Sequence, residues 1–466
     1  TLAACPAEYE SVSFVVIPSG NIENLTVKSS ALVSADGVID ASAIDVKLVK
    51  CWYQGGGGWT PGGVQTVKGK ALMPELLVND DDLLRVDLEK QQNLLRVTDP
   101  QTGEMRYEDV TVKENEDLTS ELIIRDAPSL LPVNIPADQV RQFWVTVHVP
   151  ADAAPGHYKG SLTVQCAGST AAVLPLHLEG YPFELTPSMV EQSIFYRGVL
   201  SGSETPVVQA NNKTETQYAA ELHDLVAHGV DAPMCYQTTG EGDPAAMALM
   251  KRVFEMRRDA GVSTDRFFGC FYGYGPRDDP ELARRVLGEV VELTKAFGYR
   301  EYYNYGPDEA GVEQCRQQIA PWRFLREEIG AKVYLAASPA VWMGTGPSRE
   351  ELWDQFNDVV NLVVAGGVPN PEWAARLHEA DLLIYNYANP QGGIEEPLTY
   401  RRNFGLLLWK TGYDGVMTYA YQAGWGHIWN DFDAANNWRD HVMAYPTSDG
   451  VVGTLQWEGC REGVDD

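Results

Sequence analysis

Eight short apolar runs alternate with helix-like stretches between residues 186 and 466, and this alternation limits the fold more than any other feature. The runs are rich in β-branched and aromatic residues, as buried strands are. They cover residues 193–200, 231–237, 266–274, 301–306, 332–338, 361–367, 382–388 and 415–421. Eight such units within one domain predict a (β/α)8 TIM-like barrel. A doubly wound open sheet is the rival, but "YRGVLSGSE" after the first run is a poor phosphate-binding turn.

Several stretches between the runs carry helix start and stop signals. Residues 215–229 place apolar side chains on one face, and Gly229 ends the pattern. Residues 243–261 begin with Asp243 as N-cap and Pro244 in the first turn. Pro321 is expected to kink the helix that follows the fourth run.

Residues 1–185 follow a different pattern, with partial period-2 alternation and turn clusters such as "PSGN" and "DPQTGE". This pattern predicts an N-terminal β-sandwich, so the chain is expected to be multidomain, all-β over 1–185 and a barrel over 186–466. The stretch "QGGGGWTPGG" is interpreted as a flexible, irregular insertion. Its neighbours Trp52, Tyr53 and Trp59 are expected to pack in a core or to reach the neighbouring domain or a sugar.

The composition limits the class of partner. Sixty-five acidic residues against 36 basic ones give a net charge of −29, which repels phosphate backbones and argues against nucleic acid as a partner. No apolar run is long enough to predict a membrane span. The seven cysteines form no C-x-x-C pair and are expected to be mainly small buried residues. The sequence leaves open whether two of them form a disulfide.

The chemistry of the chain centres on "EYYNYGPDEA", where Asp308 and Glu309 follow the fourth run. Catalytic groups of barrels lie where strands meet the following loops. Gly306 and Pro307 supply a bend that lets both carboxylates approach one ligand, and two carboxylates in one pocket push one pKa upward. The alternative is that Asp308 caps the next helix and Glu309 is a solvated first-turn residue.

Other run ends are rich in side chains typical of sugar sites, where aromatic faces pack on the ring and amides or carboxylates bind hydroxyls. We therefore expect a carbohydrate site at one end of the barrel. Its candidate substrate-binding residues are Tyr196, Arg197, Tyr272, Tyr305, Tyr385, Asn386, Tyr419, Trp425, Trp429 and Asp431. A metal site formed by His427, Asp431 and Asp433, or a calcium site near "VNDDDLL", is not favoured, and no metal or cofactor is expected.

Three segments carry a resemblance to a known family. "YGPDEA" is similar to the Asp-Glu motif of glycoside hydrolase family 123, "MAYPTSDGVVGTLQWEGCREGVDD" resembles its closing segment, and "RQFWVTVHVPADAAPGHYKGSLTV" resembles the edge of its N-terminal β domain. The resemblance implies a retaining β-N-acetylgalactosaminidase that uses substrate assistance on a glycan. Asp308 would orient the 2-acetamido group and Glu309 would be the general acid/base.

The sequence departs from the family pattern at Ala310, where proline is usual, and at Tyr419, where tryptophan is usual. These departures keep open a glycosidase of the same fold that acts on a non-acetamido glycan, with a second carboxylate from Asp431, Asp433 or Glu458. A non-catalytic carbohydrate-binding protein is a further alternative.

Two expectations concern the ends of the chain. The chain stops where the family's last barrel helix should begin, so that helix is expected to be missing or replaced. We expect a secreted, periplasmic or surface-lipoprotein location in a bacterium. The segment "LAAC" resembles a lipoprotein processing box, although no apolar region precedes Cys5. The sequence does not indicate an oligomeric state.

Overall fold

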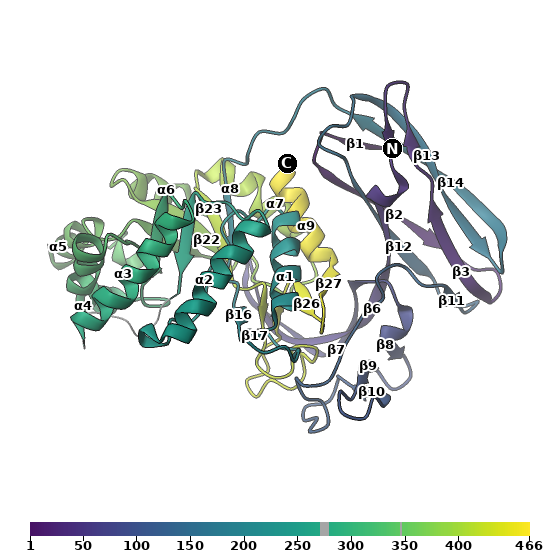
Figure 1. The fold of residues 1–466 in the computed structure, drawn as a ribbon, viewed down its shortest axis with the longest axis horizontal. Coiled ribbons are helices and arrows are strands. Elements are labelled where there is room, and N and C mark those ends of the chain that lie inside the picture. The colour runs from purple at the N-terminus through teal and green to yellow at the C-terminus, as the bar shows by residue number, and fades with distance from the viewer. Residues whose placement is uncertain (271–278, 345–346) are drawn as a thin grey trace.

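The computed structural model describes residues 1–270, 279–344 and 347–466. Two β-sheets and a small third sheet form the N-terminal part, and a parallel sheet with helices between its strands forms the other part (Figure 1). The fold is therefore β-rich sheets combined with a curled parallel sheet of the TIM-barrel type.

The N-terminal sheets pack face to face over one apolar core. The seven-stranded sheet contains β1 (Leu2–Ala4), β3 (Ile22–Ser29), β4 (Leu32–Val33), β5 (Val38–Ile39), β11 (Val133–Ile135), β13 (Gly156–Cys166) and β14 (Ser169–Gly180). The six-stranded sheet has the order β2 (Tyr9–Val16), β12 (Arg141–His148), β6 (Ile44–Thr60), β7 (Gly63–Val78), β27 (Val451–Thr454) and β26 (Ala444–Pro446). The three-stranded sheet consists of β8 (Leu84–Asp87), β9 (Gln92–Thr98) and β10 (Met105–Asp109). β26 and β27 come from the C-terminal part of the chain, so the two halves share a sheet.

The glycine-rich stretch is a strand and not the irregular insertion that we expected. It forms the outer half of β6, which pairs with β7 in one long hairpin. Glycine is required there because the backbone passes very close to its neighbours. A Cβ on Gly58 would overlap the Ile394 side chain, and Gly56 has φ +84° with the Arg439 backbone nitrogen 2.9 Å from its Cβ position.

The parallel sheet contains seven of the eight predicted strands. Its order is β15 (Glu191–Ile194), β23 (Gly415–Thr418), β22 (Leu383–Tyr387), β21 (Leu362–Gly366), β20 (Lys332–Ala336), β19 (Glu301–Tyr305) and β18 (Arg266–Gly269). The predicted second strand was wrong as a regular strand, because Pro233 has no N–H for a ladder. The segment still links both edges: Met234 N donates to Ile194 O at 2.9 Å, and Cys235 N donates to Phe268 O at 2.8 Å.

Helices alternate with these strands as the sequence pattern predicts. They are α1 (Glu215–Ala227), α2 (Pro244–Asp259), α3 (Pro280–Ala296), α4 (Val312–Phe324), α5 (Pro347–Asn357), α6 (Pro371–His378), α7 (Pro397–Phe404), α8 (Leu406–Thr411) and α9 (Leu455–Asp465). Asp243 caps α2 by accepting from the backbone of Ala245 and Ala246. Pro321 lies inside α4, which passes into a π-helical turn at Leu325–Ile329.

Short elements complete the described structure. Two-stranded pairs are formed by β16 (Val199–Leu200) with β17 (Asn212–Lys213) and by β24 (Gln422–Ala423) with β25 (His441–Val442). Short 3-10 turns lie at Ala41–Ala43, Asp81–Leu83, Gly240–Gly242 and Pro339–Val341.

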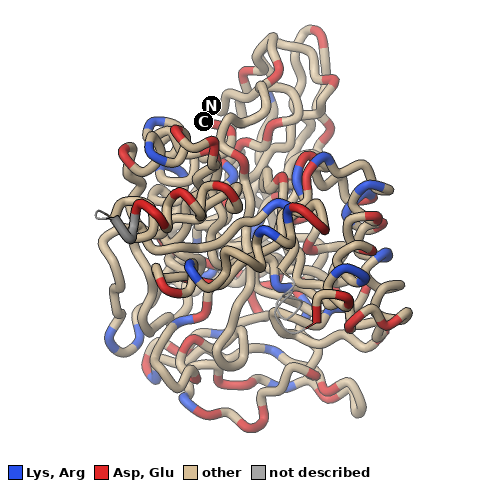
Figure 2. The backbone as a smooth tube through the Cα atoms, turned by 90° about the vertical axis from the view of Figure 1, so that its left-hand side faces the viewer, with Lys and Arg blue, Asp and Glu red and all other residues tan. Residues whose placement is uncertain are grey.

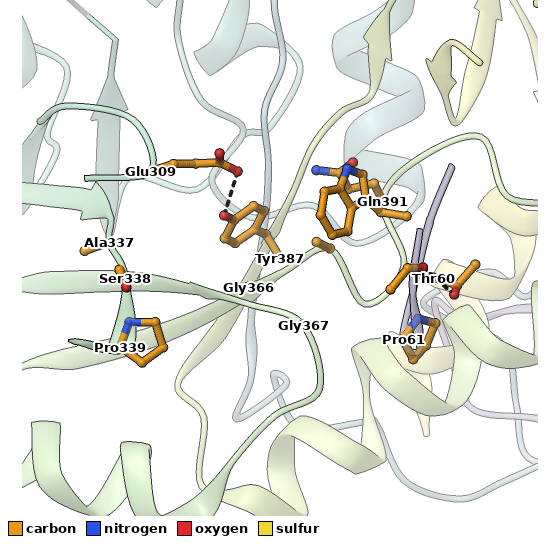
Figure 3. A pocket seen from close by; sticks show the side chains of 13 residues that line it. Thr60, Pro61, Glu309, Ala337, Ser338, Pro339, Gly366, Gly367, Tyr387 and Gln391 are labelled. Atoms are coloured by element: carbon orange, nitrogen blue, oxygen red, sulfur yellow. Dashed lines mark hydrogen bonds between the residues drawn. The ribbon is translucent and has the colours of Figure 1, made fainter. Parts of the chain in front are cut away.

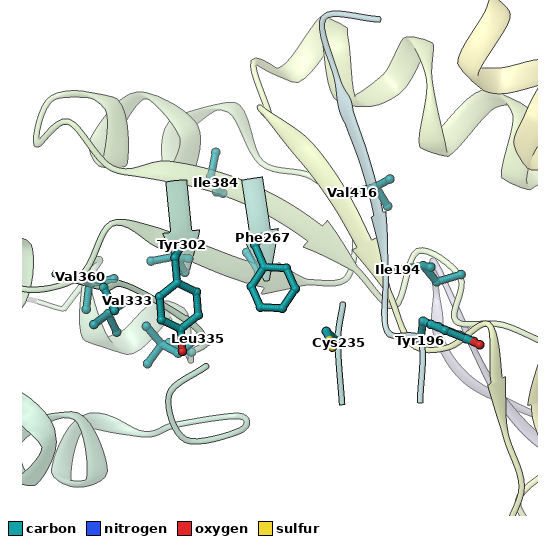
Figure 4. Packing of buried hydrophobic residues seen from close by; sticks show 14 of the residues in the cluster. Ile194, Tyr196, Cys235, Phe267, Tyr302, Val333, Leu335, Val360, Ile384 and Val416 are labelled. Carbon is teal, nitrogen blue, oxygen red and sulfur yellow. The ribbon is translucent and has the colours of Figure 1, made fainter. Parts of the chain in front are cut away.

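The outer side of the parallel sheet is held to its helices by a single apolar cluster. Figure 4 shows part of this cluster, with Phe267 on β18, Tyr302 on β19, Val333 on β20 and Ile384 on β22. A separate aromatic cluster, which includes Phe268, fills the inner side of the sheet. The sheet is thus packed on both faces, which leaves the strand ends as the place for a site.

The C-terminal helix α9 packs against α7 at unusually short range. A Cβ on Gly459 would overlap Pro397 O, and one on Gly463 would meet Arg401 O at 2.5 Å. The two glycines are four residues apart, so they line one face of α9 and allow the close approach.

The distribution of charged residues and the burial of the cysteines agree with what the composition predicts. Acidic residues are spread over both parts of the chain (Figure 2). Among the described residues, the helices contain no stretch that is both long and apolar enough to cross a membrane. Five cysteines are buried, as expected of small apolar residues: Cys5, Cys235, Cys270, Cys315 and Cys460.

Candidate active site

Two adjoining cavities lie where the barrel strands end and the β6–β7 hairpin meets them. The Asp308 cavity has a volume of about 400 Å³ and is lined by Trp59, Phe195, Arg197, Tyr236, Asp308, Glu309, Ala336, Tyr387, Gln391, Tyr419, Trp425, Trp438 and His441. The Pro61 cavity has about 440 Å³ and is lined by Trp59, Thr60, Pro61, Gly63, Glu309, Ala337, Ser338, Pro339, Gly366, Gly367, Tyr387, Ala388 and Gln391. Glu309 and Tyr387 line both cavities, so they lie at the junction.

Each carboxylate of the Asp308–Glu309 pair accepts a hydrogen bond from a tyrosine. Tyr305 at the end of β19 donates to Asp308 Oδ1 at 2.7 Å. Tyr387 at the end of β22 donates to Glu309 Oε1 at 3.0 Å (Figure 3). Both carboxylates are solvent-exposed. The pair is therefore fixed in orientation and open to a ligand.

The backbone beyond β19 turns sharply to present both side chains. Glu309 has φ +44°, in the left-handed region that non-glycine residues rarely adopt. Ala310 N donates to Ala336 O at 2.9 Å, which ties the turn to the end of β20. Helix α4 has Gly311 as its N-cap, so neither Asp308 nor Glu309 caps it. The alternative of a simple capping role is wrong.

Tyr387 remains a hydrogen-bond donor at all ordinary pH values. Burial, and next to it the negative charge of Glu309, raise the pKa of its phenol. A protonated phenol can donate to a carboxylate or a sugar oxygen but carries no charge itself.

A basic side chain also lines the Asp308 cavity. Arg197 donates from Nη1 to the Tyr419 hydroxyl at 2.9 Å, and its guanidinium lies 6.0 Å from the centre of the Tyr236 ring. Its buried Nε has no hydrogen-bond partner within the described part of the chain. Arg197 is the cation among the described residues that line this cavity.

The rim is aromatic and comes from both halves of the chain. Trp59, near the hairpin tip, stacks on Trp438 with ring centroids 6.1 Å apart and planes 9° apart. Backbone hydrogen bonds hold the hairpin in place: Gly57 N donates to Asn437 O at 2.8 Å, and Arg439 N donates to Gly57 O at 3.0 Å. The N-terminal half thus contributes an aromatic side chain to the cavity, as we expected.

An ionic cluster lies buried beneath the rim. Arg439 pairs with Glu395 and, at 3.2 Å, with Asp431. Burial raises the pKa of Asp431 to about 6, although Arg439 and the Asp440 N–H favour its charged form. Because Asp431 is used in this cluster, it supports the loop and does not line the cavity.

The structure brings together only part of the predicted set. Arg197, Tyr419 and Trp425 line the Asp308 cavity with Asp308 and Glu309, and Tyr305 holds Asp308 from below. Tyr272 lies outside the described residues. Four other predicted side chains do not line either cavity. These are Tyr196, Tyr385, Asn386 and Trp429, all buried.

Their contacts identify them as structural. Tyr196 donates to Glu221 at 2.8 Å, and Asn386 donates to Ala365 O and Gly367 O at 2.9 Å each. Trp429 packs on Tyr445 and donates to Pro446 O.

Several lining residues were missed by sequence reasoning. They are Phe195, Tyr236, Gln391, Trp438 and His441. Tyr236 lies near the end of the irregular second run and Phe195 follows β15, so their positions at strand ends could have identified them. Gln391, Trp438 and His441 come from long loops and carried no local signal.

The candidate second carboxylates do not line either cavity. Glu458 pairs with Arg461 and does not contribute to the site. Asp433 accepts from His427 N at 2.8 Å. In the ranges that the structure describes, no three potential ligands are grouped to hold a metal ion. Among described acidic residues, only Asp308 and Glu309 face the Asp308 cavity.

Comparisons with known proteins agree with this architecture. Residues 97–166 match the family model described as "Glycoside hydrolase 123 N-terminal domain". In sequence, no curated protein matches the chain. A family 123 glycoside hydrolase from Clostridium perfringens, studied for glycolipid glycan hydrolysis, is similar with a TM-score of 0.61 and 12% identity, covering 100% of this chain and 82% of that chain. A family 39 glycoside hydrolase from Bacteroides cellulosilyticus has a TM-score of 0.40 and 10% identity over 76% of each chain.

These findings confirm the resemblance to the family. The matched residues 97–166 include the whole segment "RQFWVTVHVPADAAPGHYKGSLTV", on which the resemblance partly rested. The likeness over the full chain shows that the fold is that of the family 123 glycoside hydrolase.

Proposed function

We propose, from the family 123 fold and the carboxylate pair at its strand ends, that the protein is a glycoside hydrolase acting on β-linked N-acetylhexosaminides of the N-acetylgalactosamine type. Catalysis is retaining and substrate-assisted. The observation that carries the proposal is that Asp308 and Glu309 line one cavity, each fixed by a tyrosine, without a further described acidic residue in its lining.

The chemistry needs two carboxylates that serve one side of the sugar. Asp308 accepts a hydrogen bond from the acetamido N–H and orients the group. The acetamido carbonyl oxygen then attacks the anomeric carbon, and the bond to the leaving oxygen breaks as Glu309 donates a proton to that oxygen. The product is an oxazoline-type intermediate, whose charge the Asp308 carboxylate balances.

The second step reverses these roles. Glu309, now ionised, accepts a proton from a water molecule, which attacks the anomeric carbon from the side that the leaving group vacated. The carbon–oxygen bond of the intermediate breaks, and the acetamido group is regenerated. Two inversions give net retention. Because the nucleophile belongs to the substrate, no protein carboxylate is required on the opposite face.

The position of Glu309 supports its role as acid. It lies at the junction of the two cavities, where the bond between a sugar in one cavity and a leaving group in the other would be. Trp425 and Trp59 offer aromatic surface to these groups.

A glycosidase with a second protein carboxylate across the sugar is the alternative. It requires an acidic side chain about 5–9 Å from Glu309. Asp431 and Glu458, two of its candidates, are committed to Arg439 and Arg461, which argues against it. A non-catalytic sugar-binding protein would retain binding without turnover.

The test is a panel of aryl β-glycosides with and without the 2-acetamido group. We expect turnover confined to the N-acetylhexosaminides and inhibition by a thiazoline mimic of the oxazoline. Glu309→Gln should abolish turnover and leave binding intact, and Asp308→Asn should lower kcat by about a hundredfold or more.

The matched control is Asp449→Asn, which alters a carboxylate that pairs with Arg125 at the surface and should leave turnover unchanged. Turnover of a plain hexoside that survives Asp308→Asn would overturn the assisted mechanism. Sugar binding with no turnover of any glycoside by the unaltered protein would favour the non-catalytic alternative.

A further inference from the structure

One buried histidine of the Asp308 cavity has a hydrogen-bonding capacity that the proposed mechanism leaves unused. His441 begins β25 and is only 2% exposed, yet it lines the cavity. Its Nδ1 lies 3.1 Å from Gly392 O. A carbonyl oxygen can only accept, so Nδ1 carries the proton. The other nitrogen, Nε2, is then unprotonated and can only accept a hydrogen bond.

That second nitrogen has no partner within the described ranges of the chain. It also does not belong to the fully enclosed polar atoms that lack a partner. Nε2 is therefore neither hydrogen-bonded nor fully enclosed. Because His441 is nearly buried and lines the cavity, Nε2 borders that cavity. A ligand donor is the partner that would complete its hydrogen bonding.

The ring is held rigidly in this orientation. Trp425 packs against it edge to face with centroids 4.8 Å apart, and Tyr419 does so at 5.5 Å. Gly392 is packed so closely that a Cβ there would meet Ala420 O at 2.6 Å and the backbone carbonyl carbon of His441 at 3.4 Å. The carbonyl that fixes the tautomer is therefore itself fixed.

The imidazole also stays neutral over the working range. Burial lowers the pKa of His441 to about 3, opposed by the Gly392 carbonyl and aided by the nearby Arg439 charge. A neutral ring with a fixed tautomer is a permanent acceptor, which suits a hydroxyl donor and does not suit a carboxylate or sulfate group.

We propose that His441 is a specificity-determining residue that accepts, through Nε2, a hydrogen bond from one hydroxyl of the sugar bound in the Asp308 cavity. The inference rests on the proposed function, since Asp308 is assigned the acetamido N–H and leaves the ring hydroxyls as the remaining donors. The bound sugar is an uncharged N-acetylhexosamine whose 3-, 4- or 6-hydroxyl faces His441.

Two substitutions test the roles of the two ring nitrogens separately. His441→Asn keeps a donor near the Nδ1 position for Gly392 O and removes the Nε2 acceptor. His441→Gln places an amide oxygen near the Nε2 position and removes the Nδ1 donor. The experiment measures kcat/KM of the full chain for an aryl N-acetyl-β-hexosaminide and for its 3-deoxy, 4-deoxy and 6-deoxy analogues. His157→Asn, an exposed histidine on β13, is the control.

We expect removal of one particular hydroxyl to cost the unaltered protein about tenfold. His441→Asn should lower kcat/KM for the parent substrate about tenfold. For the deoxy analogue that lacks this hydroxyl, the substitution should cause no further loss. For the other two analogues, the loss from the substitution should add to the loss from the missing hydroxyl. His441→Gln should recover most of the discrimination. Equal losses on the parent and all three analogues, or no loss in His441→Asn, would overturn the proposal.

Failure of the proposed function is distinguishable from failure of this inference. If the unaltered protein turns over no aryl glycoside, the proposed function fails. The same four sugars, as methyl glycosides, are then titrated by calorimetry against the unaltered protein and His441→Asn. A loss of affinity confined to one hydroxyl supports the role of His441, and absence of binding or uniform loss overturns it.

Discussion

The Tyr387 hydroxyl donates to Glu309 Oε1 at 3.0 Å and joins the ends of two strands, β22 and β19, that are not neighbours in the sheet. Both residues line both cavities, and Figure 3 shows the bond between them. It fixes the orientation of the proposed acid, and the half-buried phenol, with its raised pKa, does not compete for the proton.

Tyr387→Phe should therefore lower kcat by roughly tenfold with little change in KM, because the acid loses its orientation while the sugar contacts remain. Steady-state kinetics on an aryl N-acetylhexosaminide measure this. Tyr107→Phe removes a comparable hydroxyl, which donates to Asp82 O on the N-terminal half, and should have no effect. A fall in KM alone, or equal effects of both variants, would contradict the role of Tyr387.

Ala310→Pro should destabilise the protein by about 1–2 kcal/mol and reduce activity. Proline would remove the N–H that Ala310 donates to Ala336 O at 2.9 Å, and it disfavours the present conformation of the preceding Glu309. Urea unfolding and kinetics measure the two effects. Ala310→Ser keeps the N–H and is the control. An Ala310→Pro protein of unchanged stability would show that this bond contributes nothing.

Gly56→Ala should cost about 1–2 kcal/mol, because Gly56 is in the left-handed region. Its Cβ would also press on the Arg439 backbone, so the hairpin wall and Trp59 should shift and KM should rise. Gly62→Ala is matched within the same hairpin, where only Thr60 Oγ1, 3.9 Å away, would meet the new Cβ. Thermal unfolding and the KM of both variants measure these two effects. Equal behaviour of the two would mean that the glycine run is not a packed strand.

Glu458→Gln should destabilise the protein in a pH-dependent way. Burial by itself would raise the pKa of Glu458, but Arg461 and His228 outweigh it and hold the pKa at about 2. A carboxylate with a lowered folded-state pKa contributes stability above its unfolded value, near 4.5, and this stability is lost as the pH falls toward 2. The expected difference from the unaltered protein is about 2 kcal/mol at pH 6 and clearly smaller at pH 3. Urea unfolding at both pH values measures it, and a constant difference would contradict the assignment.

The order of strands and helices could be predicted from the sequence because it depends on local signals. Asp243 caps α2 as expected, since the cap and the apolar stripe lie within one helix. The position of Asp308 and Glu309 followed from their place after β19, because every strand of a parallel barrel ends at the same rim. The β-strands in the N-terminal segment that matches the family model could likewise be predicted from alternating apolar residues and turn residues.

Tertiary structure alone decided which side chains share the cavity. Trp59 and His441 lie far apart in sequence and meet there because the hairpin pairs with the loop around Asn437 and because Gly392 orients the imidazole. Conversely, Tyr196 and Trp429 have the residue types of a sugar site but are buried. Side-chain type and strand position are encoded locally. Which face a side chain takes at a strand end depends on bends, bulges and distant backbone hydrogen bonds, and these arise only when the two halves pack together.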